Sequence, residues 1–479
     1  MSSKKKTIFL AITHGWHARL LLQTKFLAEF AELEDLEIII FAPNGHENDF
    51  KEKYGHLAKI ESTKPQGGKA WNRFNRIRRH LITGKMSDTK RIQLEKYKSK
   101  SPFYYRIIEI FNFLFIHFPK TKRIYEVLEK FFFKDRYFKK YFSLYDPAAV
   151  IIVSTVHNEA FYMLQRSQIE KVKVIQIVES WDNPSSKLNQ VKHPDYFLVW
   201  NEVMGNELNE YLGIEHKRIH ITGSAFHDIY FDNSIFRSKK EIAEKYGMDP
   251  DKKWIVIAAT LTNLFPEFDL FIDGLNLIKE NSEFSNDIQI LIRPHPQAIS
   301  GYSLGHGVKE LNTIREKYNY IFYDLPPLIK SSLPVYLDKK DIKNFAEILY
   351  YSDLVISFFS TATIDAAASG TPVILPAFNH GMEDFIYPTL RERVKFTHHH
   401  KLIETGGAEI ANDMNDLEGL IKQYLDGIDN TSSDRDKLIS LECGVIDGLS
   451  YRRMVQAIAN IIFEDNKNNN LDNGPSKYY

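Results

Sequence analysis

Cysteine is nearly absent from this sequence. Cys443 is the one cysteine among 479 residues, so the chain cannot form an internal disulfide. A zinc site built from several thiolates is excluded for the same reason. A chain without disulfides fits a reducing compartment, and we expect the protein to be cytoplasmic.

Long apolar runs are missing as well. A membrane-spanning helix needs roughly 18 or more apolar residues. The nearest stretch, 107–118, is shorter than that and includes Glu109, Asn112 and His117. The lysine-rich start resembles that of a signal peptide, but "THGWH" interrupts its apolar core. We therefore expect neither a spanning helix nor a targeting segment.

An excess of charge of one sign and a metal-binding pattern are absent too. The 62 Lys and Arg balance 62 Asp and Glu, so total charge does not indicate a nucleic-acid partner. No Asp-x-Asp element stands at the end of a predicted strand, and "HHH" at 398–400 has no acid at ligand spacing. We expect no cofactor, donor binding without a metal ion, and residues 398–400 in a solvated loop or an edge strand.

What is present is an alternation of short apolar runs with helical patterns. Continuous apolar strands separated by helices are typical of parallel sheets covered on both faces. A polar stretch with a turn, 234–253, separates two such series. The sequence therefore predicts an α/β protein of two Rossmann-like domains with a cleft between them. The candidate strands are 7–12, 37–43, 148–154, 172–180, 196–201 and 218–224, followed by 254–260, 287–296, 320–327, 353–360 and 372–376.

The same pattern predicts the limits of the domains. The first domain covers 1–233 and contains an insertion at 64–141; a linker follows at 234–253. The second domain covers 254–445. After it we expect a helix at 446–464 that packs back on the first domain, and a disordered tail at 465–479.

The insertion is strongly basic and aromatic. Residues 64–141 contain 21 Lys and Arg against 6 Asp and Glu, a local net charge of +15. One interpretation is a helical insertion with a solvated basic face. Another is a surface that binds anionic lipid, where each basic residue contributes about 1 kcal/mol. Because no known nucleic-acid-binding module accompanies these residues, we expect no nucleic-acid partner.

Polar residues follow a predicted strand in "LVISFFSTATIDAAASGTPVILP", residues 354–376. Ser360 and Thr361 stand where the strand passes into a helix, whose N–H groups and dipole favour an anion such as phosphate. Asp365 lies four residues after Thr361, on the same side of the helix, and would accept hydrogen bonds from ribose hydroxyls. The alternative is that Ser360 is only an N-cap and Asp365 a partner of the helix dipole.

A second element, "LIRPHPQ" at 291–297, ends a strand of the same domain. Arg293 offers a planar fork for phosphate and His295 offers a donor near neutral pH, with prolines fixing the backbone beside them. The alternative is a turn with a surface Arg–carboxylate pair. Ligands of open α/β sheets bind beyond the carboxyl ends of the strands, so we expect both elements to line one crevice. Ser224 and Thr260, at the ends of two other strands, complete the predicted donor site.

The first domain should hold the acceptor and the catalytic base. "ESWDNPSSK" at 179–187 follows a strand and places Trp181, as a stacking platform for a sugar, at the cleft together with Glu179, Asp182, Asn183 and Lys187. The alternative is a turn with Trp181 buried.

"THGWHAR" at 13–19 follows the first strand of that domain. It offers His14, His17 and Arg19 to the acceptor or to the donor phosphate. The alternative is a helix cap and a histidine whose hydrogen bonds are satisfied within the protein.

These motifs carry a resemblance that spans most of both domains. "SDLVISFFSTATIDAAASGTPVI" resembles the donor-site signature of GT-B glycosyltransferases, where a Ser/Thr-led helix holds the phosphate and an acid, commonly Glu, holds the ribose. "RPHP" resembles an element of CMP-sugar-dependent sialyl- and Kdo-transferases and of CDP-glycerol glycerophosphotransferases. Residues 178–228, with "SWDN…K" at their centre, resemble a bacterial surface-carbohydrate biosynthesis family.

The resemblance implies a GT-B glycosyltransferase that moves a sugar from a CMP-, CDP- or UDP-linked donor to a surface glycan or a lipid-linked acceptor. Asp182 would be the base, with His14 and Glu179 as alternatives. The departing phosphate would be neutralised by Arg293, His295, Ser360 and Thr361.

Three other functions fit the same residues. One is transfer of a glycerol or polyol phosphate from a CDP-activated donor, and another is epimerisation as in UDP-N-acetylglucosamine 2-epimerases. The third is a non-catalytic scaffold that uses residues 64–141 at a membrane surface. For the transferase we expect a location in the cytoplasm, at the inner face of the cytoplasmic membrane.

Overall fold

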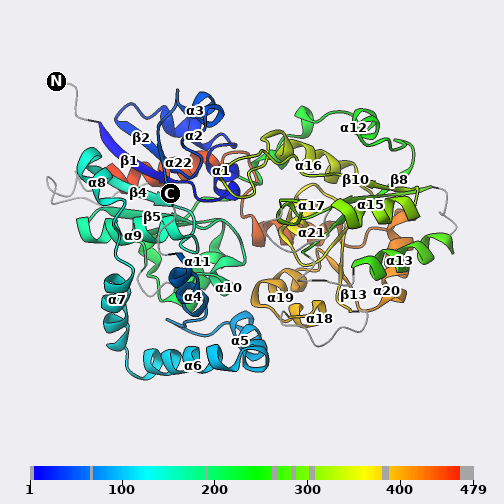
Figure 1. The fold of residues 1–479 in the computed structure, drawn as a ribbon. Coiled ribbons are helices and arrows are strands. Elements are labelled where there is room, and N and C mark those ends of the chain that lie inside the picture. The colour runs from blue at the N-terminus through cyan, green and yellow to red at the C-terminus, as the bar shows by residue number, and fades with distance from the viewer. Residues whose placement is uncertain are drawn as a thin grey trace, which may run out of the picture.

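The computed structural model describes residues 5–64, 68–188, 193–261, 265, 268–281, 287–300, 308–379 and 388–463. The predicted disordered tail lies outside the described residues. Within them, each half of the chain forms its own parallel sheet, and the two sheets occupy two neighbouring lobes (Figure 1).

The first sheet has seven strands in the order β3-β2-β1-β4-β5-β6-β7. Ile8, Phe9 and Leu10 of the central β1 have no exposed surface, which explains why the strand is apolar on both faces. The strands are β1 (Lys6–Ala11), β2 (Leu36–Ala42), β3 (Lys59–Ser62), β4 (Pro147–Ile152), β5 (Lys173–Ile177), β6 (Tyr196–Val199) and β7 (Ile219–Ile221).

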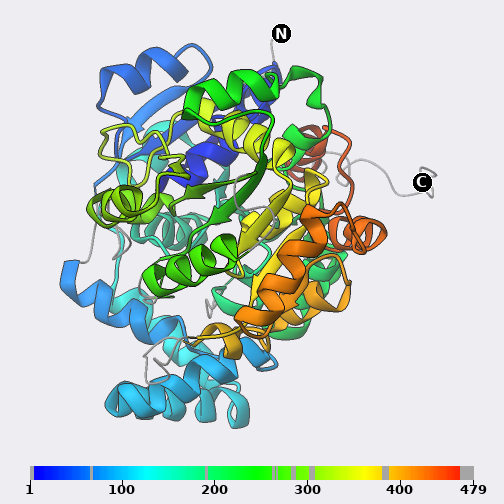
Figure 2. The same cartoon turned by 90° about the vertical axis from the view of Figure 1, so that its right-hand side faces the viewer.

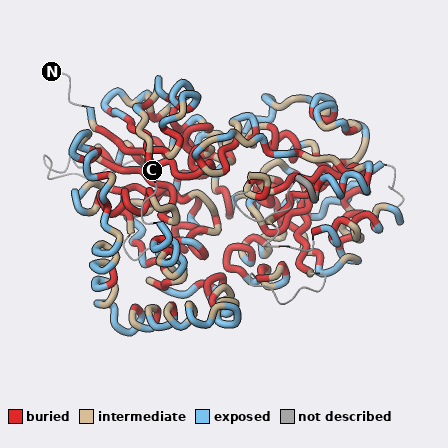
Figure 3. The backbone as a smooth tube through the Cα atoms, in the orientation of Figure 1, coloured by how far each residue is buried: buried red, intermediate tan, exposed pale blue. Residues whose placement is uncertain are grey.

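The second sheet has six strands in the order β10-β9-β8-β11-β12-β13. Its central strands are again buried on both faces, and the buried core appears as continuous red segments in each lobe of Figure 3. The strands are β8 (Lys253–Ala258), β9 (Ile288–Arg293), β10 (Ile321–Tyr323), β11 (Leu354–Ser357), β12 (Val373–Pro376) and β13 (Glu409–Ala411).

Both sheets have the strand order of a Rossmann fold, so the predicted pair of Rossmann-like domains is confirmed. The direction of strand addition reverses between β1 and β4 in the first sheet and between β8 and β11 in the second. The loops that leave the carboxyl ends of strands at such a reversal diverge and form a crevice. These two places are therefore where a ligand site is expected.

Helices separate the strands in both halves. The first half contains α1 (Gly15–Leu21), α2 (Phe26–Ala31), α3 (Asn48–Tyr54), α4 (Gly68–Arg78), α5 (Asp88–Lys100), α6 (Pro102–His117), α7 (Thr121–Phe132), α8 (Lys139–Tyr145), α9 (Asn158–Glu170), α10 (Asn183–Ser186) and α11 (Glu202–Leu212). The rest contains α12 (Lys239–Tyr246), α13 (Phe268–Glu280), α14 (Pro296–Ile299), α15 (Val308–Lys317), α16 (Lys340–Tyr351), α17 (Thr361–Ala368), α18 (Leu390–Arg393), α19 (Thr397–Glu404), α20 (Met414–Leu425), α21 (Ser432–Glu442) and α22 (Ser450–Phe463).

Two edge strands and one helix differ from the sequence-based expectation. β3 and β13 are short and carry few apolar residues, because an edge strand has only one neighbour and is partly exposed. The predicted linker contains α12, whose start is fixed by a capping box between Ser238 and Glu241. Short polar elements of this kind lack the apolar run by which a strand or helix is recognised.

The insertion and the last helix connect distant parts of the chain. α5 of the insertion reaches the second half, where the Thr397 N–H donates to Thr89 Oγ1 at 3.0 Å. α6 and α7 project from the first lobe, away from both sheets (Figures 1 and 2). α22 lies against the first sheet's helices, and Lys6 Nζ donates to the Ile462 carbonyl at 2.8 Å.

A buried ion-pair network joins the two halves. Asp341, at the start of α16, has no exposed surface and accepts from Arg19 Nη1 at 2.6 Å. The same carboxylate accepts from Arg293 Nη2 at 2.8 and 2.9 Å, and Arg293 Nη1 donates to Asp324. Two arginines and two aspartates thus balance their charges inside the protein, as buried charges require.

The first turn of α1 lies unusually close to the second half. The Gly15 N–H donates to the Pro334 carbonyl at 2.8 Å, and a Cβ at Gly15 would lie 1.8 Å from the Val335 carbonyl oxygen. Only glycine permits this approach. The contact fixes the loop after β1, including His14, against the other half of the protein.

Asp341→Asn should destabilise the protein strongly, because it leaves two buried guanidinium groups facing one remaining carboxylate. We expect a loss of about 3–5 kcal/mol in the free energy of unfolding, measured by urea denaturation. Glu210→Gln is the matched control, since its pair with Lys85 is solvent-exposed and should leave the midpoint unchanged. Equal midpoints for the two variants would contradict a structural role for Asp341.

Candidate active site

Three histidines gather at the carboxyl ends of β1 and β4, where the first sheet reverses. His14 and His17 follow β1, and His157 follows β4. The His14 and His157 rings stack at 5.2 Å between centroids, and the His17 ring lies 5.3 Å from that of His157. We call these three residues the histidine cluster.

Backbone groups orient two of these rings. The Thr13 N–H donates to His17 Nδ1 at 3.3 Å, and His17 Nε2 lies 3.3 Å from Glu179 Oε2. The Trp16 N–H likewise donates to His14 Nδ1 at 3.3 Å, so His14 is the N-cap of α1. The capping alternative is therefore the observed one for His14.

His14 and His157 of the histidine cluster are uncharged at neutral pH. Burial, together with the neighbouring His17 and His295, lowers the pKa of His14 to about 4, although Glu179 acts in the opposite direction. Burial and its two histidine neighbours lower the pKa of His157 to about 3. Burial acts to raise the pKa of Glu179, but His17, His157 and Lys187 outweigh it and lower that pKa to about 2.

Asp182 and Lys187 form an ion pair at the end of β5. Lys187 Nζ lies 2.7 Å from Asp182 Oδ2, and Ser180 Oγ donates to Asp182 Oδ1 at 2.6 Å. Burial opposes ionisation of Asp182, but Lys187, His398 and Ser180 outweigh it and hold its pKa well below the usual range. The Lys187 side chain keeps 56% of its exposure, so its ammonium group faces the solvent side of the cleft.

Trp181 is buried, which agrees with the alternative interpretation of residues 179–187 as a turn and not with a stacking platform for a sugar. Its ring centroid lies 5.0 Å from that of His398 and 5.5 Å from that of His399, both on α19 of the second half. The ring therefore forms part of the contact between the halves and offers no open face to a sugar. Asn183 is also buried and begins α10.

The prediction that residues 398–400 lie in a solvated loop or an edge strand was wrong for His398 and His399. His398 and His399 are buried in α19, and His398 Nδ1 lies 3.0 Å from Ser185 Oγ. The sequence did not indicate this burial, because the partners of the two rings lie on α10 and at the end of α18. In the described part of the chain, no group of three or more His, Cys, Asp or Glu is arranged to hold a metal ion.

His295 faces the histidine cluster from the second half. It follows β9, and its Nδ1 accepts the Gln297 N–H at 3.2 Å, which leaves Nε2 as a donor. Its ring lies 6.4 Å from that of Trp16 on α1. Burial, Arg293 and Lys187 lower the pKa of His295 to about 4, so Lys187 of the first half lies within electrostatic reach of His295.

The guanidinium of Arg293, predicted to bind phosphate, is already bonded to two carboxylates of the protein. Its guanidinium is buried, lies over the Phe345 ring, and is engaged by Asp324 and Asp341. Arg19 binds Asp341 too. A phosphate at Arg293 would compete with both carboxylates, so its role in donor binding stays a prediction.

The helix α17 begins at the carboxyl end of β11, as predicted. Ser360 occupies the N-cap position, but its hydroxyl lies 3.1 Å from Ser357 Oγ and does not cap the helix. Thr361 is exposed at the first turn. Asp365 Oδ1 accepts from Tyr230 at 2.9 Å and lies 3.7 Å from His227 Nε2, so a contact with ribose stays a prediction.

The two remaining donor-site candidates are buried at strand ends. Thr260 follows β8, and Ser224 follows β7. Ser224 Oγ has no hydrogen-bond partner within the part of the chain that the structure describes. A buried hydroxyl in that state is available to a ligand.

Sequence reasoning missed His157, Asp324 and Asp341. His157 stands just beyond the strand 148–154, in the position that drew attention to His14, and the same rule would have found it. The two aspartates are far from Arg293 in the sequence, and only the folded chain brings them to its guanidinium.

Comparison with known proteins identifies the family. Residues 120–460, well over half of the chain, match the family described as "CDP-Glycerol:Poly(glycerophosphate) glycerophosphotransferase". No match to a curated protein sequence was found.

Solved structures share the fold at low sequence identity. The S. aureus MnaA–UDP co-structure is 13% identical, with a TM-score of 0.54 and coverage of 99% of this chain and 100% of that one. A glycosyltransferase from Rickettsia africae is 13% identical, with a TM-score of 0.53 and coverage of 97% and 99%. UDP-GlcNAc 2-epimerase from Neisseria meningitidis, bound to UDP-GlcNAc, is 11% identical, with a TM-score of 0.51 and coverage of 95% and 100%.

The predicted GT-B architecture agrees with these folds. The family match confirms the predicted transferase that acts on a surface polymer. The chain therefore belongs to the CDP-glycerol:poly(glycerophosphate) glycerophosphotransferase family.

Proposed function

We propose that the protein transfers glycerol phosphate, or a related polyol phosphate, from a CDP-activated donor to a hydroxyl of a surface polymer. The family match supports this donor class. The supporting observation in the structure is that His295 of the second half, an N–H donor, lies near both the histidine cluster and the Lys187 cation of the first half. The UDP-linked donors of the epimerases belong to those proteins, since the similarity to them extends to the fold alone.

The chemical step requires charge neutralisation and a base. The acceptor oxygen attacks the phosphorus that carries glycerol, the bond to the bridging oxygen of the diphosphate breaks, and CMP leaves. Lys187 and the His295 N–H stabilise the negative charge that develops on CMP. The Asp182 carboxylate positions Lys187 and is itself too weakly basic to take the acceptor proton, given its lowered pKa.

His14 is the base we infer from the three candidates. Its pKa of about 4 exceeds those of Glu179 and Asp182, and its ring is neutral at physiological pH. To accept a proton at Nε2, the ring must carry its other proton on Nδ1, which gives up the 3.3 Å bond from Trp16. Losing one such bond costs about 1 kcal/mol, a small fraction of a catalytic barrier.

Transfer of a sugar from a CMP- or CDP-linked donor is the second candidate, since the acceptor then attacks the anomeric carbon and an anionic nucleotide leaves in the same way. The experiment offers CDP-glycerol and CMP- and CDP-sugars with a polymer acceptor, and identifies the linkage in the product. We expect a phosphodiester. A glycosidic bond would favour the second candidate, and isomerisation of the donor without acceptor would favour an epimerase.

Lys187→Met should lower kcat by roughly 10²–10³, as loss of one preorganised charge stabiliser does. The fold should persist, because the Lys187 side chain is largely exposed. Lys217→Met is the control, since Lys217 pairs with Glu215 on an exposed loop away from the cleft. Turnover of the Lys187 variant at the wild-type rate would remove Lys187 from the mechanism.

The pH dependence should report His14. As a base it must be unprotonated, so kcat/KM should stay level down to about pH 5 and fall as the pH drops through about 4, the pKa of His14. An acid limb near 6.5, the value of an ordinary histidine, would contradict the assignment. His14→Gln should abolish turnover and His216→Gln, an exposed control, should not, with circular dichroism confirming that each variant is folded at the pH used.

We also propose that the protein binds an anionic membrane through α6 and α7. No helix in the described part of the chain has the length and apolar composition to cross a membrane. The structure nevertheless exposes ten large apolar side chains on and beside these two helices, each at 48–75% of its full exposure. They are Phe103, Ile110, Phe113, Ile116, Phe118, Ile124, Val127, Leu128, Phe131 and Phe132, and we call them the α6–α7 face.

A bilayer is the occupant that fits this face. Large apolar side chains exposed in this number on two neighbouring helices indicate an interaction site, and the surrounding insertion carries a net charge of +15. Apolar side chains that enter the lipid while basic residues meet anionic headgroups are typical of a monotopic interfacial helix. Both helices project away from the sheets, so a flat surface can reach them (Figure 2).

Replacing both Phe131 and Phe132 by Glu should weaken binding to phosphatidylglycerol vesicles by at least about 10-fold, since burial of each ring contributes roughly 2 kcal/mol. Co-sedimentation measures the binding, and phosphatidylcholine vesicles or high salt should reduce it for the wild type. Leu277→Glu, at an exposed position on α13, is the control. Equal sedimentation of wild type and double variant would refute the membrane proposal.

A further inference from the structure

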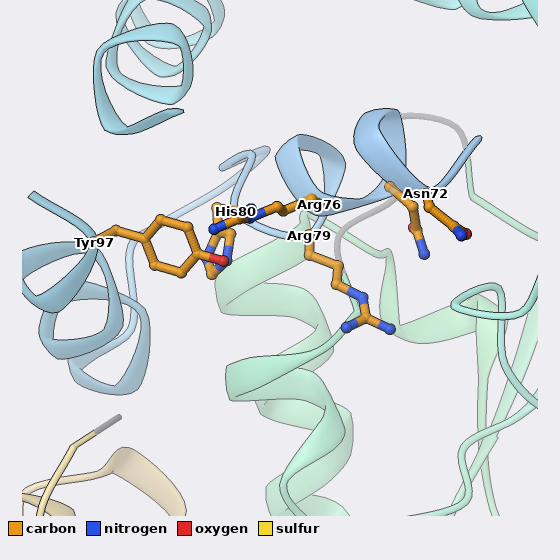
Figure 4. A pocket seen from close by; sticks show the side chains of 6 residues that line it. Asn72, Arg76, Arg79, His80 and Tyr97 are labelled. Atoms are coloured by element: carbon orange, nitrogen blue, oxygen red, sulfur yellow. The ribbon is translucent and has the colours of Figure 1, made fainter. Parts of the chain in front are cut away.

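A cavity of about 250 Å³ lies in the insertion between α4 and α5, and no function assigned above uses it. Its lining is polar and basic, and none of the six lining residues is acidic. Arg76 reaches from α4 towards Tyr97 on α5, with His80 beside it, and Arg79 extends from the end of the same helix (Figure 4). The lining residues are Asn72, Asn75, Arg76, Arg79, His80 and Tyr97.

The cavity is held rigidly to the active site. On the buried side of α4, Asn75 Nδ2 donates to the Val156 carbonyl at 3.0 Å and Arg78 Nη2 donates to the Thr155 carbonyl at 2.5 Å. Thr155 and Val156 immediately precede His157 of the histidine cluster. At the start of α5, Ser87 Oγ donates to the Ser185 carbonyl of α10.

Aromatic side chains preorganise Arg76. Its guanidinium carbon lies 4.3 Å from the centre of the Tyr104 ring, and its Nη2 donates to Ser101 Oγ at 3.3 Å. An arginine already fixed on an aromatic face loses little conformational entropy when it binds an anion. The side chain remains exposed, so a ligand can reach it.

The cationic groups around the cavity act on one another. Burial and the positive charges of Lys90, Arg79 and Arg76 lower the pKa of His80 to about 3. Burial and Arg79 lower the pKa of Lys90 to about 7. An anion bound among these groups would relieve their mutual repulsion.

The field of Arg79 also reaches the active site. Arg79 is among the groups that act on the pKa of His157 and of Lys187. Because α4 is also bonded to Thr155 and Val156, the cavity lies near the histidine cluster, in the domain that should hold the acceptor. A ligand that spans both places would have an anionic group among the arginines and a hydroxyl at the histidine cluster.

We propose that this cavity binds a phosphodiester group of the acceptor, through Arg76 and Arg79 with His80 and the two asparagines, and so presents the acceptor hydroxyl to His14. Two guanidinium groups supply bidentate donors, and the amides supply neutral ones, which suits a singly charged phosphodiester. The acceptor role rests on the proposed function, whereas binding of the phosphodiester does not.

The direct test measures binding without turnover. Glycerophosphoglycerol, a soluble phosphodiester, is titrated into wild type and into the double variant Arg76→Gln, Arg79→Gln, with calorimetry as the readout. We expect at least about 10-fold weaker binding by the double variant, from the loss of two charge-assisted contacts. Arg73→Gln, at an exposed position of the same helix outside the cavity lining, is a control that removes one charge and should bind like wild type. Equal binding by the double variant and wild type would overturn the proposal.

Kinetics and vesicles separate the sources of the phosphodiester. If the polymer supplies it, the double variant should raise KM for the acceptor at least about 10-fold with KM for the donor unchanged. If vesicle binding weakens and the acceptor KM does not change, the group belongs to a lipid headgroup and the acceptor role is wrong. A wild-type protein that binds glycerophosphoglycerol but has no transferase activity would contradict the proposed function. The binding site would still stand if the double variant then lost that binding.

Discussion

The buried carboxylate of Asp341 is the constraint on which the rest of the structure depends. It joins Arg19 of the first half to Arg293 of the second, with no exposed surface of its own. A buried charge of this kind tolerates little displacement, because each partner moved away leaves an unpaired ion in a medium of low dielectric. The bridge therefore fixes how the carboxyl ends of the two sheets meet, and with them His14 and His295.

That arrangement decides the distribution of charge in the cleft. Burial keeps the His14 and His295 rings neutral, while the Lys187 side chain, paired with Asp182, stays largely exposed. Neutral donors and one exposed cation suit an anion that must be bound and then released. The insertion is attached to both halves, since α4 is bonded to the loop of His157 and α5 is bonded to the start of α19.

The alternation of strands and helices could be predicted because central parallel strands are buried on both faces and must be apolar throughout. Every predicted strand has a counterpart, and the omitted ones, β3 and β13, are edge strands of mixed polarity. Placement of candidate residues at strand ends succeeded for His14, Glu179, Lys187, His295 and Ser360 for the same reason. The rule that ligands bind at those ends needs only the position of the strand in the sequence.

Sequence alone determined the fold class, the family resemblance and which loops face the cleft. Only the tertiary structure decided what each side chain does there. In the folded chain Arg293 is paired with Asp324 and Asp341. Trp181 forms part of the contact between the halves, where it packs against His398, and the buried His398 lies against α10. The physical reason is that secondary structure follows from local periodicity, whereas the partner of a buried charge or ring comes from a segment tens to hundreds of residues away. Arg19 and Asp341 are such a pair, 322 residues apart.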